Sequence, residues 1–244
     1  RYTFNLRPNV KWHDGKDFTS ADVAYSIKQV KELQSFGRIT FAHLVDVETP
    51  DPLTAVIVLS KRSGFLLRAL HGAITPIVPK HLYEGTDVRQ NPYNLKPVGT
   101  GPFVFREWVK GSHVILDRNP NYWDAPKPYL DRIVIRFIPD PGARSAALET
   151  GEVHLASENP IPLSEVGRFR QLPGINVEER GHGYLGSQTQ LEFNLRNPIL
   201  QNPKVRLAIA HAINIEQIRD IAWYGYATLS PTPITVLDKL FHDP

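Results

Sequence analysis

The sequence predicts a mixed α/β chain that contains more than one sheet. Runs of strand length, either alternating or wholly apolar, recur along the chain, as in residues 2–6 and 54–59. Segments whose apolar residues recur at helical spacing separate these runs. Strands and helices alternate without the strict repetition of a barrel or a doubly wound sheet, and no internal repeat is visible.

Composition narrows the classes of protein to which the chain can belong. Its 244 residues suggest one large domain or two smaller ones, and 41% hydrophobic residues suffice for a sizeable core. No apolar run approaches the roughly 18 residues of a membrane span. The net charge of +3 is spread along the chain, and the densest basic cluster, at 168–170, is too small for a nucleic-acid interface. Because cysteine is absent, disulfides, thiolate metal sites and thiol nucleophiles are excluded.

The N-terminal residues predict a hairpin followed by a helix. Residues 2–6 alternate between polar and apolar side chains, and the Asp-Gly pair at 14–15 is a strong signal for a tight turn. Thr19 and Asp22 have the spacing of a capping box, at which a helix begins. Apolar residues then recur at helical spacing, and we expect this helix to end near Gly37.

Two strands and a short helical segment come next. The strands are expected at 44–48 and 54–59, joined by residues 49–52, whose two prolines fix a turn. Residues 65–70 form a short helical segment. Residues 73–78 are apolar but contain a proline, which predicts an edge strand or an extended pass.

The middle of the chain predicts three more strands. A turn at 98–102, built from two glycines and a proline, leads into strands at 103–109 and 113–117. An aromatic-rich loop at 119–123 follows. Residues 133–138 are apolar except for Arg136, which predicts a strand of the buried type.

The C-terminal part is predicted to be mainly helical. A helix begins at 141–142, and Gly151 stands where its C-cap belongs. The Asn-Pro pair at 202–203 supplies an N-cap and a proline at the first position of a second helix. A third helix runs from Asn214 to Gly225. Three further segments are expected to be extended: 153–156, 175–179 and 184–195.

Short motifs carry a resemblance to a known family. Read locally, they consist of turn-making glycines and of aromatic rings beside turns, so they mark the scaffold more than a site. Their order and spacing extend over nearly the whole chain, at residues 2–7, 10–15, 18–23, 99–103, 119–123, 147–153, 193–195 and 204–214. Together they resemble family 5 extracellular solute-binding proteins, the dipeptide-, oligopeptide- and nickel-binding proteins of bacterial ABC importers.

The resemblance implies an α/β, mixed-sheet, periplasmic binding protein type II-like two-lobed fold. The chain is expected to be a fragment, with the first lobe largely present and the second truncated. Residues 1–95 would be the smaller subdomain of the first lobe and residues 96–183 its core. Residues 184–244 would be a hinge strand and the incomplete start of the second lobe, too few to bury a core alone.

The resemblance also implies where a ligand would lie. The hinge strand should be near residues 184–193, and the loop that follows residues 153–156 should face the cleft between the lobes. Uncharged hydrogen-bonding groups and one aromatic ring suit a binding cleft. Tyr184 and Gln188 also fit ordinary exposed strand positions, and that alternative stays open. The candidate ligand-binding residues are Tyr184, Gln188, Thr189, Ser157, Glu158 and Asn159.

The residues contain no enzyme constellation. There is no Gly-x-Ser-x-Gly elbow, no His-Glu-x-x-His helix and no P-loop. The nine histidines are scattered, with no metal-ligand spacing, and His211 is expected to be a half-buried packing residue on a helix. We therefore expect no enzymatic activity, no metal site and no cofactor.

The expected function is that of the extracytoplasmic substrate-binding component of an ABC transporter. It would capture peptides or similar small solutes and deliver them to the permease membrane subunits, as a monomer that binds no nucleic acid. It would be periplasmic or extracellular, with or without a lipid anchor. A nickel or metallophore carrier of the same fold is the alternative. A hydrolase with catalytic residues outside these 244 has no support in the sequence.

Overall fold

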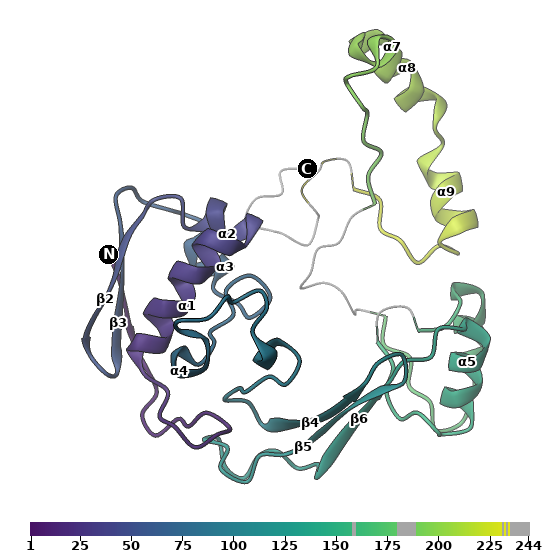
Figure 1. Cartoon of the computed structure of the whole chain (residues 1–244). Coiled ribbons are helices and arrows are strands. Elements are labelled where there is room, and N and C mark those ends of the chain that lie inside the picture. Colours follow the sequence, from purple (N-terminus) through teal and green to yellow (C-terminus); the bar gives the residue numbers. More distant parts are fainter. Residues whose placement is uncertain (158–159, 180–188, 231, 233, 235–244) are drawn as a thin grey trace. The chain divides into compact units, whose positions relative to one another are not determined.

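The computed structural model describes residues 1–157, 160–179, 189–230, 232 and 234 (Figure 1). The chain divides into two compact units, Arg1–Phe137 and Ile138–Pro244. This boundary lies inside the segment 96–183, which was expected to form the core of the first lobe. The predicted division into 1–95, 96–183 and 184–244 stays a prediction.

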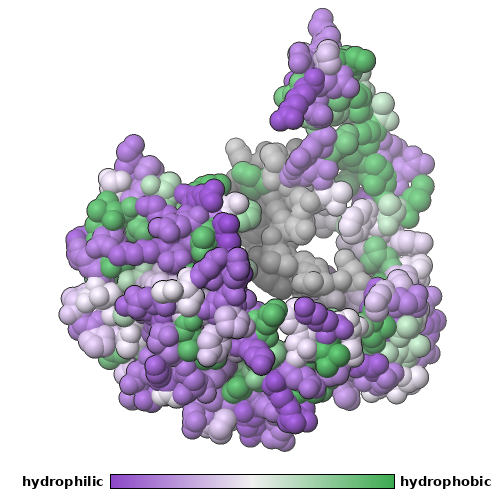
Figure 2. All heavy atoms as spheres, in the orientation of Figure 1, coloured by the Kyte–Doolittle hydropathy of each residue, from purple (hydrophilic) through white to green (hydrophobic). Residues whose placement is uncertain are grey.

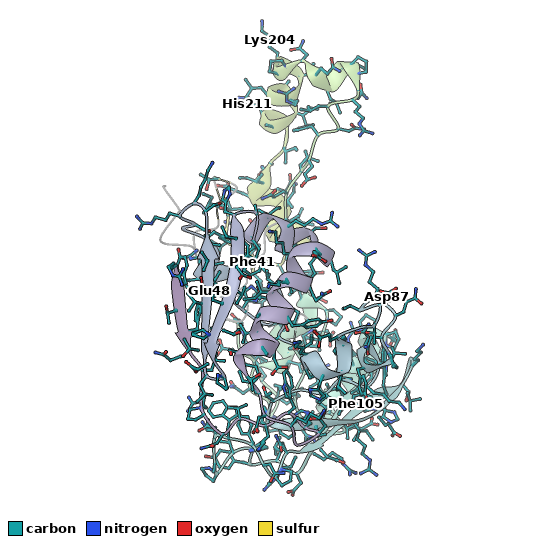
Figure 3. The ribbon with its side chains drawn as sticks, turned by 60° about the vertical axis from the view of Figure 1, so that its left-hand side comes forward. Phe41, Glu48, Asp87, Phe105, Lys204 and His211 are labelled. Atoms are coloured by element: carbon teal, nitrogen blue, oxygen red, sulfur yellow. The ribbon has the colours of Figure 1, made fainter. Side chains whose placement is uncertain are left out.

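An antiparallel sheet covered by a helix forms the core of the N-terminal unit. The helix α1 (Ser20–Leu33) contacts the two paired strands at the centre and edge of that sheet (Figure 1). Phe41 is fully buried between α1 and the sheet (Figure 3), in one cluster with residues of both. The sheet has the strand order β1 (Tyr2–Asn5), β3 (Thr54–Leu59) and β2 (Leu44–Asp51).

The predicted opening hairpin is wrong in its strand pairing. β1 pairs with β3, where Tyr2 lies opposite Ile57, whereas the turn at 14–15 closes only a single bridge between Lys11 and Asp17. The chain between β1 and this turn is irregular and contains Asn9 with a φ of 60°. The two sides of the turn therefore do not continue as a pair of hydrogen-bonded strands. The backbone N–H and C=O groups of β1 form hydrogen bonds with β3 instead.

The helix α1 begins as predicted but ends earlier. Thr19 and Asp22 form the capping box, and Gln34 is extended after Leu33. A second helix, α2 (Ser35–Thr40), then contains Gly37. A Cβ atom on this glycine would lie 2.0 Å from the carbonyl oxygen of Val30. Gly37 therefore permits close packing of α2 on α1 and does not cap α1.

Residues 73–78 form no strand: residues 73 and 74 lie in a turn, in which the Thr75 amide donates to the His71 carbonyl at 2.8 Å, and 76–78 form an irregular pass. The hydroxyl of Ser26, on α1, accepts a hydrogen bond from the Val78 amide at 2.9 Å and donates to the Val78 carbonyl at 3.2 Å. A side chain thus satisfies the backbone groups that a neighbouring strand would otherwise pair. Short helices flank this pass: α3 (Leu66–Ala69), α4 (Lys80–Tyr83) and η1 (Pro92–Asn94).

A second antiparallel sheet has the strand order β4 (Phe103–Val109), β5 (His113–Arg118) and β6 (Arg132–Arg136). The three predicted strands are present, and Leu116 lies opposite both Phe105 and Ile133. The expectation that the third strand is buried is wrong, because Val134 is 51% and Ile135 45% exposed. β6 lies at the edge of this sheet, so an apolar run does not by itself place both faces in a core.

The C-terminal unit contains a helix packed beside a small cluster. Asp140 caps α5 (Pro141–Glu149) by accepting a hydrogen bond from the Ala143 amide, and Gly151 follows the C-cap with a φ of 75°. Both helix-end predictions are confirmed. Two short helices come next, η2 (Leu163–Glu165) and α6 (Val166–Phe169). The buried residues of the cluster are Ile161, Val166 and Phe169.

The strands expected at 153–156 and 175–179 are not present. The Val153 amide donates to the carbonyl oxygen of Ala147, on α5, so the chain turns back on the helix. Ile175 and Val177 pack against the cluster around Phe169. Contacts with helices, which the local sequence pattern does not specify, therefore replace a strand pairing at both places.

Three helices occupy the last described part of the chain: α7 (Pro198–Gln201), α8 (Pro203–Ala212) and α9 (Ile215–Ala222). Their N-caps are Asn197, Asn202 and Asn214, whose side chains each accept a backbone hydrogen bond. None of the described residues in these helices is buried, and their apolar side chains show on the surface in Figure 2. The described part of 184–244 therefore forms no core of its own, as expected.

Candidate ligand-binding site

Of the six predicted ligand-facing residues, the structure describes two. Ser157 and Thr189 are both exposed and lie outside regular secondary structure. Tyr184, Gln188, Glu158 and Asn159 lie outside the described residues. The grouping of these six side chains around one ligand stays a prediction.

The described chain on either side of residues 158 and 159 contacts α5 and the cluster beside it. Before these residues, the Val153 amide donates to the Ala147 carbonyl at 3.0 Å. After them, Ile161 is 9% exposed and packs in the cluster with Phe169. Ser157 is exposed, and its part in ligand binding stays a prediction.

In the N-terminal unit, His13 joins two of the sequence motifs. Its Nδ1 accepts a hydrogen bond from the Gly99 amide at 3.1 Å, and its backbone amide donates to the Gly99 carbonyl at 2.8 Å. With Nδ1 as the acceptor, Nε2 carries the proton and donates to the Gly101 carbonyl at 3.0 Å. A neutral imidazole thus holds both glycines of the turn.

A third motif reaches the same turn through Asn119. Its side-chain amide donates to the Gly101 carbonyl at 2.9 Å, and its backbone amide donates to the Pro102 carbonyl at 2.9 Å. Three motifs far apart in the sequence therefore meet at one junction. The geometry supports their interpretation as scaffold. Sequence reasoning did not identify His13 as the connector, because a lone histidine beside a turn gives no signal of its partners.

A surface hollow of 510 Å³ lies beside the start of α1. Asp22, 4% exposed, accepts hydrogen bonds from the backbone amides of Thr19 and Lys80, both at 2.8 Å. The indole of Trp12 also donates to this carboxylate, at 3.3 Å. The carboxylate joins three segments, so its function is structural. The hollow is lined by Gly15, Lys16, Asp17, Thr19, Ala21, Asp22, Lys80, His81 and Glu84.

His81, which lines the hollow, is hydrogen-bonded to Asp14, with Nε2 and Oδ2 2.6 Å apart. Partial burial raises the pKa of Asp14, but hydrogen bonds from His81 and from the Lys16 amide outweigh it and hold that pKa below its ordinary value. The carboxylates of Asp14 and Asp22 are thus both held by protein contacts. Among residues 1–157, 160–179 and 189–230, no three His, Asp or Glu side chains converge as metal ligands would.

The expectation for His211 is wrong. This side chain is exposed at the end of α8 (Figure 3) and not half-buried. The alanines and isoleucines around it form no buried face in the described part of the chain. Within that part, no helix is both long and apolar enough to cross a membrane.

Comparison with known proteins decides the family. The model of bacterial extracellular solute-binding proteins, family 5 Middle, matches residues 1–244. The chain belongs to this family. The family 5 chain is also 30% identical over 224 residues to the oligopeptide-binding protein AppA of Bacillus subtilis (strain 168). That alignment covers 89% of the chain and 40% of AppA.

Two solved structures of similar proteins confirm the fold class. NikZ from Campylobacter jejuni, in complex with Ni(L-His), matches with a TM-score of 0.79 and 30% identity over 95% of the chain and 45% of NikZ. DppA from Helicobacter pylori, in complex with the peptide STSA, matches with a TM-score of 0.78 and 30% identity over 96% of the chain and 49% of DppA. The family 5 chain thus spans about half the length of the relatives it matches, as part of their two-lobed fold.

Proposed function

We propose that the protein containing these residues is the substrate-binding component of an ABC importer and captures peptides or similar small solutes. The observation that carries this proposal is the 30% identity, over 224 residues, with a protein named for oligopeptide binding. A similar structure at the same identity, that of DppA, holds a peptide. Both relatives are about twice as long as this chain, so the ligand would lie between this part and the rest of the protein.

The proposed site is formed by the loop 157–159 and the segment 184–189. Ser157 and Thr189 are exposed, and their hydroxyl groups offer hydrogen bonds without charge. Tyr184 would stack on a peptide bond, and Gln188 and Asn159 would pair with main-chain amides. Glu158 is a substitute anchor for a ligand amino group. Such groups read the backbone of a peptide more than its side chains, which suits a carrier of many peptides.

The proposed mechanism is capture by closure. Two lobes that exchange between open and closed forms are shifted toward the closed form by a ligand that binds it better. The permease would then recognise the closed form. No chemical step is required, so we propose a carrier without enzymatic activity or a cofactor. It would act as a monomer outside the cytoplasm, with or without a lipid anchor, and without nucleic-acid partners.

A thermal-shift screen of the full-length protein tests this proposal. A solute that binds only the folded state raises the melting temperature, and the rise grows with the logarithm of its concentration above the dissociation constant. Tetraalanine and a tryptic digest of casein are expected to raise it by several degrees, whereas free alanine is not. No shift with peptides or with nickel–histidine complexes would contradict the proposal.

A nickel or metallophore carrier is the second candidate. The observation that favours it is the match with NikZ, whose structure contains Ni(L-His). In the same screen, a shift with nickel–histidine and none with peptides would select this candidate. Elemental analysis of the purified full-length protein would then show nickel.

A further inference from the structure

Two short helices of the N-terminal unit present large apolar side chains to solvent. On α2, Phe36 is 68% and Ile39 72% exposed. On α3, Leu67 is 61% exposed, and Phe65, the N-cap of that helix, is 50% exposed. A single exposed apolar side chain is ordinary, whereas a group of them marks an interaction surface. The next question is therefore whether these four side chains lie together.

Both helices pack on one buried cluster. Phe41, directly after α2, and Leu66, on α3, are fully buried in the cluster that also contains Val30, in the last turn of α1. The Ser60 amide donates to the His43 carbonyl at 2.9 Å, which joins the chain that enters α3 to the chain that leaves α2. Figure 1 shows both helices near this end of α1. The four exposed side chains therefore belong to one region of the surface.

The inner sides of the two helices are fixed, so neither can turn to bury these side chains. Gly37 packs against the Val30 carbonyl too closely to admit a Cβ atom. Leu66 has no exposed area and holds α3 from inside. Before α3, the Tyr2 hydroxyl donates to the Ser63 carbonyl at 2.8 Å. The exposure of the apolar side chains is thus a consequence of the packing beneath them.

The same region carries exposed cations. Lys61 and Arg62 lie in the segment between β3 and α3, and Arg38 lies on α2. The Arg38 guanidinium donates to the main-chain carbonyl of Glu32, at 3.2 and 3.3 Å. A neutral carbonyl does not cancel its charge. Positive charges therefore surround the exposed apolar side chains.

Acidic residues are missing from the segments that form this region. Residues 52–83 contain four Lys and Arg residues and no Asp or Glu, and residues 33–45 contain no Asp or Glu either. The acids of the adjacent strand β2 pair with other cations: Asp46 with Lys28 at 2.9 Å, and Glu48 with Arg1. The region thus combines apolar area with a local excess of positive charge.

We propose that this region is a docking surface for an anionic phospholipid membrane. The apolar side chains would enter the boundary between headgroups and acyl chains, and the cations would bind lipid phosphates. A second copy of the chain fits poorly, because a symmetric contact brings the same cations together. The α2–α3 surface consists of Phe36, Arg38, Ile39, Lys61, Arg62, Phe65 and Leu67.

This inference goes beyond the proposed function, which concerns the capture of a solute. A membrane-docking surface would hold the protein near a permease without any contact to the solute. Docking depends on charge and apolar area, so salt should weaken it, and neutral lipids should support it poorly. Both properties can be measured without knowing the solute.

The test measures co-sedimentation of the full-length protein, made without lipid modification, with vesicles. One set contains phosphatidylglycerol and phosphatidylcholine, and the other contains phosphatidylcholine alone. The first variant, Lys61→Gln/Arg62→Gln, removes two cations from the α2–α3 surface. The second, Ile39→Ser/Leu67→Ser, removes apolar area from both helices. Thermal unfolding of each variant verifies that it is folded at the temperature of the assay.

The matched control is Lys96→Gln/Lys110→Gln, which removes the same charge from exposed positions of the same unit that lie outside the α2–α3 surface. We expect the wild type to bind the anionic vesicles and to be released by high salt. Each cation near an anionic membrane contributes about fivefold in affinity, so the first variant should bind about tenfold more weakly or worse. The second should also lose roughly tenfold, because two apolar side chains no longer insert. The control should bind like the wild type.

Three results overturn the inference. One is a wild type that binds neither set of vesicles, or both sets equally. Another is a variant of the α2–α3 surface, of either kind, that binds as well as the control. The third is binding that requires the permease in the vesicles, which would make the partner a protein. The solute screen is independent of all three, so the proposed function would survive them.

Discussion

His13 and Gly99 form two hydrogen bonds: the Gly99 amide donates to the imidazole Nδ1 of His13 at 3.1 Å, and the backbone amide of His13 donates to the Gly99 carbonyl at 2.8 Å. A Cβ atom added to Gly99 would lie 3.3 Å from Cε1 of this ring. The ring cannot easily move away, because Nε2 is also bound to the Gly101 carbonyl. His13, which is far from Gly99 in the sequence, thus leaves little room for a side chain at position 99.

Gly99→Ala is therefore expected to destabilise the protein by about 1–2 kcal/mol, the cost of overpacking a fixed neighbour. Gly101→Ala is the matched control. No atom lies within 4 Å of an added Cβ there, so the change should be within about 0.5 kcal/mol of neutral. Urea unfolding of both variants measures the difference. Equal effects would show that His13 does not make the site sterically tight.

Gly37→Ala should be more severe, with a loss of at least about 2 kcal/mol. The added Cβ would overlap the Val30 carbonyl at 2.0 Å, so α2 must move away from α1. Gly167, on α6, has open space around an added Cβ, and Gly167→Ala should be neutral or slightly stabilising. Thermal unfolding of both variants checks this. A stable Gly37→Ala variant would contradict the observed packing of α2 on α1.

Ser145→Ala is expected to stabilise the protein by about 0.5–1 kcal/mol. Ser145 is 7% exposed, and its hydroxyl has no hydrogen-bond partner among the described residues. Ser26→Ala is the opposite case, because the Ser26 hydroxyl bonds both backbone groups of Val78, and its loss should cost about 1–3 kcal/mol. Chemical unfolding of the full-length protein measures both. Destabilisation by Ser145→Ala would reveal a partner outside the described part.

Asp14→Asn should change how stability depends on pH. The folded-state pKa of Asp14 lies below its ordinary value, so the carboxylate stabilises the fold above about pH 4. This contribution is lost as the pH falls through the folded-state pKa. The stability difference between wild type and Asp14→Asn should thus be larger at pH 5 and pH 7 than at pH 3, up to about 1 kcal/mol for a pair of partly exposed side chains. Melting at pH 7, 5 and 3 tests it, and a difference that grows in acid would contradict the assignment.

Local patterns predicted where the main helices begin and where most strands lie, because the causes are within a few residues, whereas the end of α1 at Leu33 was not predicted. The capping box of Thr19 and Asp22 and the asparagine caps of α8 and α9 are of this kind. Pairing partners were harder to predict. Nothing near β1 indicates that Tyr2 lies opposite Ile57, and nothing near residue 78 indicates the hydroxyl of Ser26. Tertiary contacts determine both the strand that pairs with β1 and the side chain that binds the Val78 backbone.

The candidate site was predictable only in outline. The family resemblance indicated residues 157–159 as candidates. Neither spacing nor residue type indicates that the guanidinium of Arg144, on α5, donates a hydrogen bond to the Pro160 carbonyl nearby. Long side chains make contacts across the fold that periodicity cannot predict. Arg144 is therefore found only in the structure, as is the connection of three motifs by His13.

We propose that the full-length protein is a two-lobed carrier that closes on a small solute. Small-angle X-ray scattering of the full-length protein tests it most directly, with and without a saturating solute taken from the thermal-shift screen. We predict a smaller radius of gyration in the presence of that solute, with free alanine as the inactive control. A radius of gyration that stays the same while the solute is shown to be bound would contradict capture by closure.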